Sequence, residues 1–125
     1  MTRLALLLAL LGATPAAGGG FTVAGEPFAQ ADIMDARTVP DGSGSAALLV
    51  TFTPKGAAHL KALSMAHDGQ PVAIVLDGRT LSEPVMHRPI DDGQLEITGD
   101  FGTFDAAATL AKRISGKDPV PEGGE

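Results

Sequence analysis

The sequence predicts an α+β domain: a two-layer sandwich in which two helices pack on one face of a mixed β-sheet. Three observations predict this class. The expected elements follow one another in the order β-β-α-β-β-β-α. Each expected helix carries a single apolar stripe, which must be buried against another layer. The expected strands alternate polar and apolar residues or form short apolar runs, which indicates sheets with a buried face.

The first two predicted strands form a hairpin. Residues 32–39 and 46–53 (DIMDARTV and AALLVTFT) are compatible with strands, and the turn-rich stretch PDGSGS lies between them. Two strands joined in this way predict a β-hairpin with a longer connection.

A helix is predicted over 54–67. Thr53 supplies a hydroxyl N-cap, and Pro54 suits the first helical position because no partner is needed for its missing N–H. Asp68 and Gly69 end the helix, since glycine readily adopts the left-handed conformation that follows helix C-termini. The residues expected to face inward are Ala57, Leu60 and Leu63.

Asp77 and Gly78 predict a second hairpin. The apolar run 71–76 suits a central strand, and Asp-Gly favours a type I′ turn because both turn positions need positive φ. Pro84 in the returning strand cannot donate to a ladder, so this strand is expected at a sheet edge or with a bulge. If the strands at 46–53 and 71–76 are parallel, the connection between them is a right-handed crossover.

One more strand and helix complete the predicted domain. Residues 94–98 (QLEIT) alternate in polarity and predict a strand. Thr103 is expected to cap a helix that runs to Ser115 and ends at Gly116. Its inward stripe has helical spacing and consists of Ala107, Leu110, Ala111 and Ile114.

Residues 1–17 have the pattern of a secretory signal. Arg3 precedes the apolar run Leu4–Leu11, and small residues follow. This run is too short for a membrane-spanning helix, which needs about 20 residues. Cleavage is expected after Ala16 or Ala17, with an uncleaved signal anchor as the alternative. The chain is therefore expected to be periplasmic or secreted, without a transmembrane segment after cleavage.

The remaining chain is expected to contain one domain. Residues 18–30 are interpreted as a flexible lead-in with a short strand at 21–23, residues 31–116 as the domain, and residues 117–125 as a polar tail. Nine basic residues against fifteen acidic ones give a formal charge of −6, which argues against nucleic-acid binding. The absence of cysteine excludes disulfides, thiol catalysis and cysteine metal sites.

The three histidines do not have the spacing of a metal site. His59 and His67 are separated by about 12 Å along the expected helix, which is too far for two imidazoles to share one ion. His87 lies beside Arg88 at a strand end. All three are expected to be solvated or capping side chains, and no metal site is predicted.

The loop after the first strand imitates two binding motifs without meeting their requirements. Asp41, Ser43 and Ser45 match the first ligand positions of a calcium loop, but Ala46 and Phe52 replace the required glycine and glutamate. A glycine pattern in the same loop precedes a strand instead of opening a helix, so it offers no helix N-terminus to a dinucleotide phosphate. No cofactor is expected.

The sequence offers little support for catalysis. Asp91 and Asp92, with Asp100 and Asp105 nearby, form an acidic segment without an aromatic wall that would raise a carboxyl pKa. No base is predicted beside Ser82, and the sequence contains no nucleophile elbow. We predict that the protein is not an enzyme. A small hydrolase that uses Ser82 or the acidic loop is an alternative.

Several segments and their order carry a family resemblance. The segments are ADIMDARTV, LLVTFTPKGAAHL, PVAIVLDGRTLSEPVMHRPI and LEITGDFGTFDAAATLAKRI, followed by a closing G-x-x-P-x-P, over residues 31–121. The most specific piece is AIVLDG-x4-S-x-P, followed by a Pro-Ile pair and an I-x-G-x-F step. Together they resemble the head subdomain of the first large periplasmic domain of SecD, a subunit of the SecDF protein-export complex.

This resemblance implies a role in protein export. It implies a head that contacts an unfolded preprotein and swings relative to a membrane-proximal base, driven by proton flow through transmembrane helices. The sequence shows no transmembrane bundle, base subdomain or proton-carrying residues, so the energy-transducing part is not carried over. The partners it implies are unfolded or extended polypeptide, or a Sec-type membrane partner.

The motif residues themselves are expected to be structural, because turns, caps and strand ends account for them. They are Asp77, Gly78, Ser82, Pro84, Ile90 and Gly99. We predict a non-catalytic, exported module that binds polypeptide, with strand addition at the edge that bears Pro84 as one physical route. The alternative is a structural or assembly protein that uses the same fold without binding clients.

Overall fold

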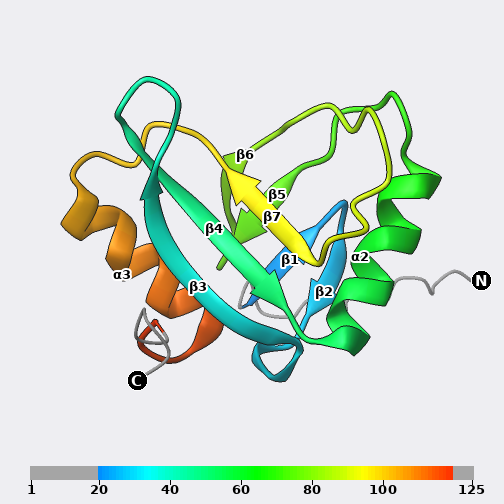
Figure 1. The fold of residues 1–125 in the computed structure, drawn as a ribbon, viewed down its shortest axis with the longest axis horizontal. Helices are drawn as coiled ribbons and strands as arrows, with labels where there is room; N and C mark the ends of the chain where they lie inside the picture. The colour runs from blue at the N-terminus through cyan, green and yellow to red at the C-terminus, as the bar shows by residue number, and fades with distance from the viewer. Residues whose placement is uncertain (1–19, 120–125) are drawn as a thin grey trace, which may run out of the picture.

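The computed structural model describes residues 20–119 (Figure 1). Within this range the strands are β1 (Phe21–Val23), β2 (Glu26–Phe28), β3 (Ile33–Pro40), β4 (Ala46–Phe52), β5 (Ile74–Leu76), β6 (Arg79–Ser82) and β7 (Gln94–Ile97). The helices are the short 3₁₀ helix η3 (Gln30–Asp32) and the α-helices α2 (Pro54–Ala66) and α3 (Phe104–Ser115).

The strands form two antiparallel sheets. One has the order β2-β1-β5-β6 and the other the order β3-β4-β7. The predicted α+β class with two helices is confirmed, as are both hairpins. The prediction of a single mixed sheet is wrong, because β4 and β5 lie in different sheets and no parallel crossover joins them. The physical reason is that β5 pairs with β1, a partner distant in the sequence that local patterns do not specify.

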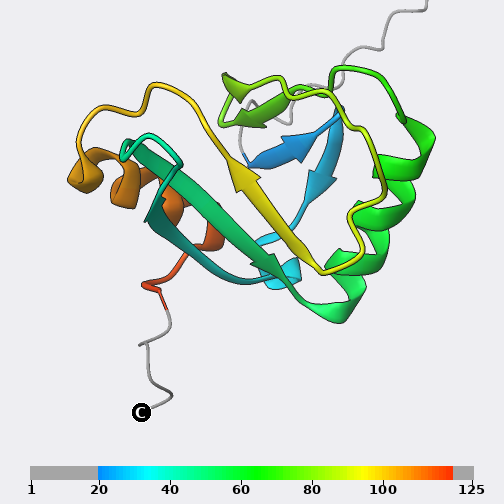
Figure 2. The same cartoon turned by 45° about the horizontal axis from the view of Figure 1, so that its top comes forward.

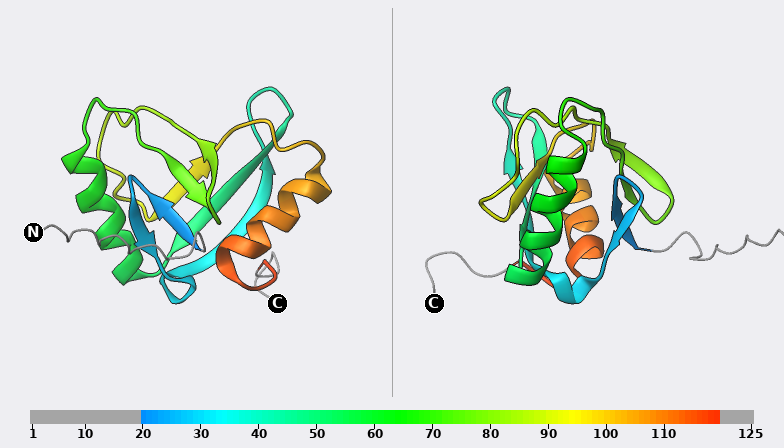
Figure 3. Two further views of the ribbon diagram at one scale, coloured as in Figure 1. Left: turned by 180° about the vertical axis from the view of Figure 1, so that it is seen from behind. Right: turned by 90° about the vertical axis from the view of Figure 1, so that its right-hand side faces the viewer.

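The fold has two layers around one core. Figure 3 (right) shows the three-stranded sheet on one side, with both helices and the four-stranded sheet on the other. Figure 2 shows that α2 and α3 lie at opposite ends of this arrangement. The most deeply buried side chains come from both sheets and both helices, and they include Leu48, Val50, Leu60, Ile74, Ile97 and Ile114.

Helix α2 is capped as predicted. The Thr53 Oγ1 accepts a hydrogen bond from the Gly56 N–H at 3.2 Å, and the helix begins at the following proline. At the other end His67 is the C-cap, and its Nδ1 lies 3.0 Å from the carbonyl oxygen of Leu63. Of the residues expected to face inward, Leu60 and Leu63 are buried and Ala57 packs against the core.

Helix α3 also has the predicted ends. The Thr103 Oγ1 accepts a hydrogen bond from the Ala106 N–H at 3.0 Å, and Gly116 closes the helix in the left-handed conformation at φ 78°. The predicted stripe is buried in full: Ala107, Leu110, Ala111 and Ile114.

The Asp-Gly turn between β5 and β6 has the predicted conformation. Asp77 and Gly78 have φ values of 50° and 84°, which a type I′ turn requires. The expectation for the returning strand is also confirmed. Strand β6 lies at the edge of its sheet, and its register with β5 shifts between Ile74 and Val75.

The segment 18–30 is predicted to be a flexible lead-in, but from Gly20 onward the structure shows it as part of the folded domain. Strands β1 and β2 form a hairpin that pairs with β5, and Phe21, Val23 and Phe28 are buried. The domain therefore includes this hairpin and does not begin at residue 31. The two phenylalanines are isolated in the sequence, and their inward orientation becomes clear only when β5 completes the sheet.

The predicted signal at residues 1–17 lies outside the described residues. Within residues 20–119, no helix is both long enough and apolar enough to cross a membrane. The predicted polar tail is described as far as Pro119. Its first residue is attached to the domain, because the Lys117 Nζ donates a hydrogen bond to the carbonyl oxygen of Ile33 at 3.0 Å.

Candidate functional site

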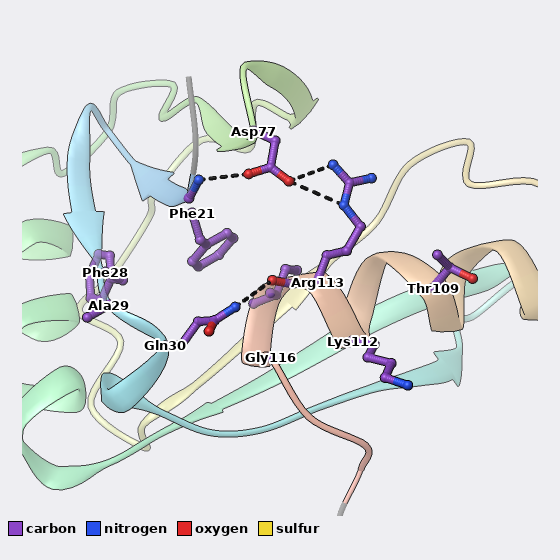
Figure 4. Close-up of a pocket in the computed structure, with 11 residues that line it drawn as sticks. Phe21, Phe28, Ala29, Gln30, Asp77, Thr109, Lys112, Arg113 and Gly116 are labelled. Atoms are coloured by element: carbon purple, nitrogen blue, oxygen red, sulfur yellow. Dashed lines mark hydrogen bonds and ion pairs between the residues drawn. The ribbon is translucent and has the colours of Figure 1, made fainter. Parts of the chain in front are cut away.

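A surface cavity of about 600 Å³ lies between α3 and the β1–β2 hairpin. Figure 4 shows its lining, with Phe21 and Phe28 on the hairpin side and α3 opposite. Phe21, Phe28 and Ile114 are themselves buried in the core and give the cavity an apolar floor. The polar residues that line it come from η3, the β5–β6 turn and α3: Gln30, Asp77, Thr109, Lys112 and Arg113.

Asp77 connects the three segments that surround one end of this cavity. Its Oδ1 accepts a hydrogen bond from the Gly20 N–H at 2.7 Å. Its Oδ2 accepts from the Arg113 Nη2 at 2.6 Å and from the Arg113 Nε at 3.2 Å (Figure 4). The turn therefore holds both the start of β1 and the flank of α3.

These contacts also change the acidity of the turn. The hydrogen bonds from Arg113, followed by the one from the Gly20 N–H, hold the pKa of the Asp77 carboxyl below its ordinary value. The carboxylate is consequently ionised at neutral pH, and it orients the Arg113 guanidinium at the edge of the cavity.

The opposite end of the cavity is closed by Gln30 and the end of α3. The Gln30 Nε2 donates a hydrogen bond to the carbonyl oxygen of Arg113 at 3.3 Å (Figure 4). A Cβ atom on Gly116 would lie only 2.5 Å from the Gln30 Oε1, so a glycine at this position allows η3 and the helix end to approach. This close approach shapes that end of the cavity.

His59 contacts Phe28, one of the residues that line the cavity. Its ring stacks on Phe28 with centroids 4.4 Å apart, and its Nε2 lies 2.5 Å from the Glu26 Oε1. His59 was expected to be solvated or capping, but it joins α2 to the β1–β2 hairpin. His67 caps α2 as expected, while His87 lines a separate surface depression with Met65. Among the described residues, no group of three or more His, Cys, Asp or Glu side chains could hold a metal ion.

Only two of the motif residues lie at or beside the cavity, and these are Asp77 and its turn neighbour Gly78. Ser82 ends β6, and the Pro84 carbonyl oxygen accepts a hydrogen bond from the Val72 N–H at 2.9 Å. The other two motif residues also occupy structural positions, away from the cavity.

The Ile90 N–H donates to the Ser64 Oγ at 2.9 Å, which attaches the loop before β7 to α2. A Cβ on Gly99 would lie 3.0 Å from the carbonyl oxygen of Leu81, so the loop after β7 passes close to β6. Turn, strand-end and packing requirements thus support the structural interpretation of the motif, which remains a prediction about function.

The loop at 41–46 is held by its own hydrogen bonds. The Asp41 Oδ1 accepts from the N–H and Oγ of Ser43, both at 2.7 Å, and from the Ser45 N–H at 2.9 Å. The bonds from Ser43 lower the pKa of the Asp41 carboxyl. In the acidic segment, the Asp92 Oδ1 accepts from the Gln94 N–H at 3.1 Å, and Asp105 lies in the first turn of α3. Both regions therefore contain ordinary turn and helix-end contacts.

The sequence analysis did not find the cavity or four of the five polar residues that line it. Gln30 lies in the segment predicted as a lead-in, and Thr109, Lys112 and Arg113 lie outside the predicted apolar stripe of α3. The one available signal was the pair of phenylalanines before residue 31, which is unusual in an exposed segment.

The comparisons with known proteins agree with one another. The sequence model of the SecDF P1 head subdomain matches residues 19–116. The chain belongs to this family. It is 38% identical over 91 residues to protein translocase subunit SecDF of Thermus thermophilus, and 37% identical over 90 residues to protein translocase subunit SecD of Dictyoglomus turgidum. These alignments cover 73% and 71% of this chain.

Solved SecDF structures share the fold. A structure of SecDF, described as a membrane component that enhances protein export, superposes with a TM-score of 0.67 at 34% identity. It covers 78% of this chain and 44% of the other. The super-membrane-facing form of SecDF gives the same TM-score at 35% identity and covers 13% of that chain. The SecD head resemblance is thereby confirmed.

The chain matches only a small part of these relatives. The matched region spans 12% of the Thermus protein and 22% of the Dictyoglomus protein. What these relatives share with this chain is the head subdomain, and their names describe them as subunits of the protein translocase. The activities that belong to the rest of SecDF are not transferred by the match.

Proposed function

We propose that this protein is a non-catalytic, exported module that binds extended polypeptide and assists protein translocation. The observation that carries the proposal is the apolar cavity between α3 and the β1–β2 hairpin, in a chain of the SecDF head family. A volume of about 600 Å³ is within the range of pockets that hold drug-sized ligands, so it accommodates a large side chain and its neighbours.

Physical chemistry favours an apolar segment of an unfolded chain as the occupant. Such a segment exposes side chains that a native protein would bury, and their transfer into an apolar site is favourable by about 25 cal/mol per Å² of apolar surface. The aromatic rings of Phe21 and Phe28 are fixed by the hairpin, so they lose little freedom on binding. Binding by apolar burial also tolerates many sequences, as an export client pool requires.

The proposal places the module in the periplasm, next to a Sec-type membrane partner. It assigns no catalytic role to Ser82. Among residues 20–119, the Ser82 hydroxyl has no hydrogen-bonded histidine, lysine or carboxylate that would act as its base. A Ser82→Ala variant is therefore expected to bind polypeptide as well as the original chain.

Filling the cavity tests the proposal. Thr109 is exposed on α3 and lines the cavity, so Thr109→Phe places an aromatic ring at its mouth. Ala108 is the exposed neighbour on the same helix and does not line the cavity, so Ala108→Phe is the matched control. Binding is measured by fluorescence anisotropy with a labelled, permanently unfolded polypeptide.

We expect Thr109→Phe to weaken binding at least about tenfold, because a filled mouth excludes the anchoring side chain. Ala108→Phe should bind like the original chain. If the original chain does not bind the unfolded polypeptide, the proposed function is wrong, and the structural or assembly role becomes the better interpretation. Equal binding by both variants would show that another surface is used.

A further inference from the structure

Charged side chains beside the apolar floor indicate which polypeptide segments the cavity selects. We propose that it prefers extended segments in which a large apolar residue is followed or preceded by Asp or Glu. This inference rests on the proposed function, and it adds a sequence preference that the proposed function does not require.

The lining of the cavity differs in charge from the chain as a whole. The ionisable residues that line the cavity are Asp77, Lys112 and Arg113, which together carry one net positive charge. The chain as a whole has a formal charge of −6. Asp118, which does not line the cavity, lies 3.3 Å from the Lys112 Nζ and offsets part of this charge in a strongly exposed contact. The lining itself still carries an excess of positive charge on an acidic protein, so a carboxylate is attracted to it more than to the acidic surface elsewhere.

The two cations, Arg113 and Lys112, are placed so that they can accept another partner. The Arg113 and Asp77 side chains are 47% and 37% exposed, and Lys112 pairs with Asp118 at 3.3 Å in an even more exposed contact. Exposed ion pairs of this kind contribute little to stability, because water and salt screen them. Sharing the cation of such a pair with an incoming carboxylate therefore costs little.

The contacts of Arg113 leave some of its N–H donors for a second carboxylate. Its contacts with Asp77 use the Nε and Nη2 groups, both directed to a single carboxylate oxygen. A guanidinium has five N–H donors, so others remain for a second carboxylate. Figure 4 shows the guanidinium held by Asp77 at the end of the cavity, beyond Phe21. Asp77 thus acts as a positioning residue that fixes the donor group in advance.

The apolar floor and this cation lie in one cavity, so recognition has two parts. The apolar side chain is buried against Phe21, Phe28 and Ile114, and the neighbouring carboxylate interacts with Arg113 or Lys112. A lysine or arginine beside the apolar residue would instead face these two cations. Such like-charge contact disfavours the wrong segment and so provides specificity.

Three labelled peptides test this preference on the unmodified protein. They share a Gly-Ser-rich extended sequence with one central Phe and differ only in its two flanking residues, which are Glu, Gln or Lys. We expect affinity to fall in the order Glu, Gln, Lys, with at least about a threefold step between Glu and Gln, since each exposed pair changes affinity by a small factor. The step should shrink as salt is added.

Charge-removing variants locate the effect. Arg113→Gln and Lys112→Gln should each reduce the ratio between the Glu and Lys peptides, with the larger reduction for Arg113→Gln. Lys61→Gln, which removes an exposed lysine on α2 away from the cavity, should leave the ratio unchanged. If Arg113→Gln is too unstable to assay, Lys112→Gln and the salt dependence still decide.

The outcomes separate the two proposals. Binding of all three peptides with equal affinity, or tightest binding of the Lys peptide, overturns the sequence preference and leaves polypeptide binding standing. Equal effects of Lys61→Gln and Lys112→Gln also overturn it, because the attraction would then come from net charge alone. If none of the peptides binds and the unfolded polypeptide does not bind either, the proposed function itself falls.

Discussion

Single atoms decide how closely the elements of this domain approach. Gly56 lies in the first turn of α2, where an alanine Cβ would lie 2.5 Å from the backbone carbonyl oxygen of Asp32 and 3.2 Å from the Phe52 ring. Backbone cannot move aside as the end of a flexible side chain can. The glycine is therefore required by the contact between α2 and η3, which the sequence alone does not show.

Gly56→Ala should destabilise the domain by about 1–3 kcal/mol, the usual cost of overpacking. The sign of this stability change is informative. Alanine is the better helix former by about 1 kcal/mol, so the same substitution would stabilise a free helix. Urea unfolding measures the difference. Gly42→Ala is the control, since nothing lies within 4 Å of its added Cβ, and it should change stability little. A stabilised Gly56→Ala variant would contradict the close approach.

The ionised turn residue Asp77 predicts a pH dependence of stability. Its folded-state pKa is lowered from 3.8 by Arg113 and the Gly20 N–H, so its contribution is complete above that value and is lost as pH falls through the folded-state pKa. Asp77→Asn keeps a residue that tolerates positive φ but removes the charge. The stability gap between the two proteins should be widest at neutral pH and narrow in strong acid, as measured by urea unfolding across pH. A gap of constant size would mean that the turn conformation, and not the charge, accounts for the effect.

Among the elements, the long loop from β6 to β7 depends on one buried hydroxyl of α2. Ser64 is fully buried, donates to the carbonyl oxygen of Lys61 at 2.8 Å and accepts from the Ile90 N–H at 2.9 Å. The loop backbone thereby gains a partner in place of water. The resemblance to SecD identified Ile90 as a motif position, and its backbone contact gives that position a structural reason.

Ser64→Ala should cost about 1–3 kcal/mol, because it leaves the half-buried Ile90 N–H without its protein partner. Thermal unfolding and hydrogen exchange at Ile90 measure the effect, and exchange there should accelerate. Ser82→Ala is the matched control, since this hydroxyl has no hydrogen-bond partner among residues 20–119. Equal stability of the two variants would show that water replaces the Ser64 hydroxyl without loss.

Helix ends and turns were predicted correctly because each depends on residues that are close together in the sequence. Helix caps at Thr53 and Thr103, the left-handed Gly116 and the Asp77 turn each depend on residues within one turn of the chain, and all four are where the sequence places them. Strand pairing depends on distant partners. The sequence contains no local information that assigns β5 to β1 instead of β4, so it predicts one sheet where the structure has two.

For the whole molecule, the same limit explains why the cavity was missed. The cavity forms because the β1–β2 hairpin packs against the domain. It also needs the contact between Asp77 and Arg113, which are 36 residues apart in the sequence. Residues that look isolated in the chain become the floor of a site once the fold is complete. Locating the candidate site therefore depends on placing the start of the domain correctly.

Two phenylalanines of different burial test whether the hairpin belongs to the folded unit. Phe28 is 3% exposed, and its ring contacts Phe52 at a centroid distance of 5.3 Å and stacks on His59 at 4.4 Å. Phe104 at the start of α3 is 45% exposed. Phe28→Ala should cost about 3–5 kcal/mol, because it removes a large side chain from a packed core and leaves a cavity. Phe104→Ala should cost little, since its ring is already largely in contact with water. Both are measured by urea unfolding. A mobile lead-in would tolerate Phe28→Ala as well as Phe104→Ala, and that result would remove both the hairpin and its cavity from the domain.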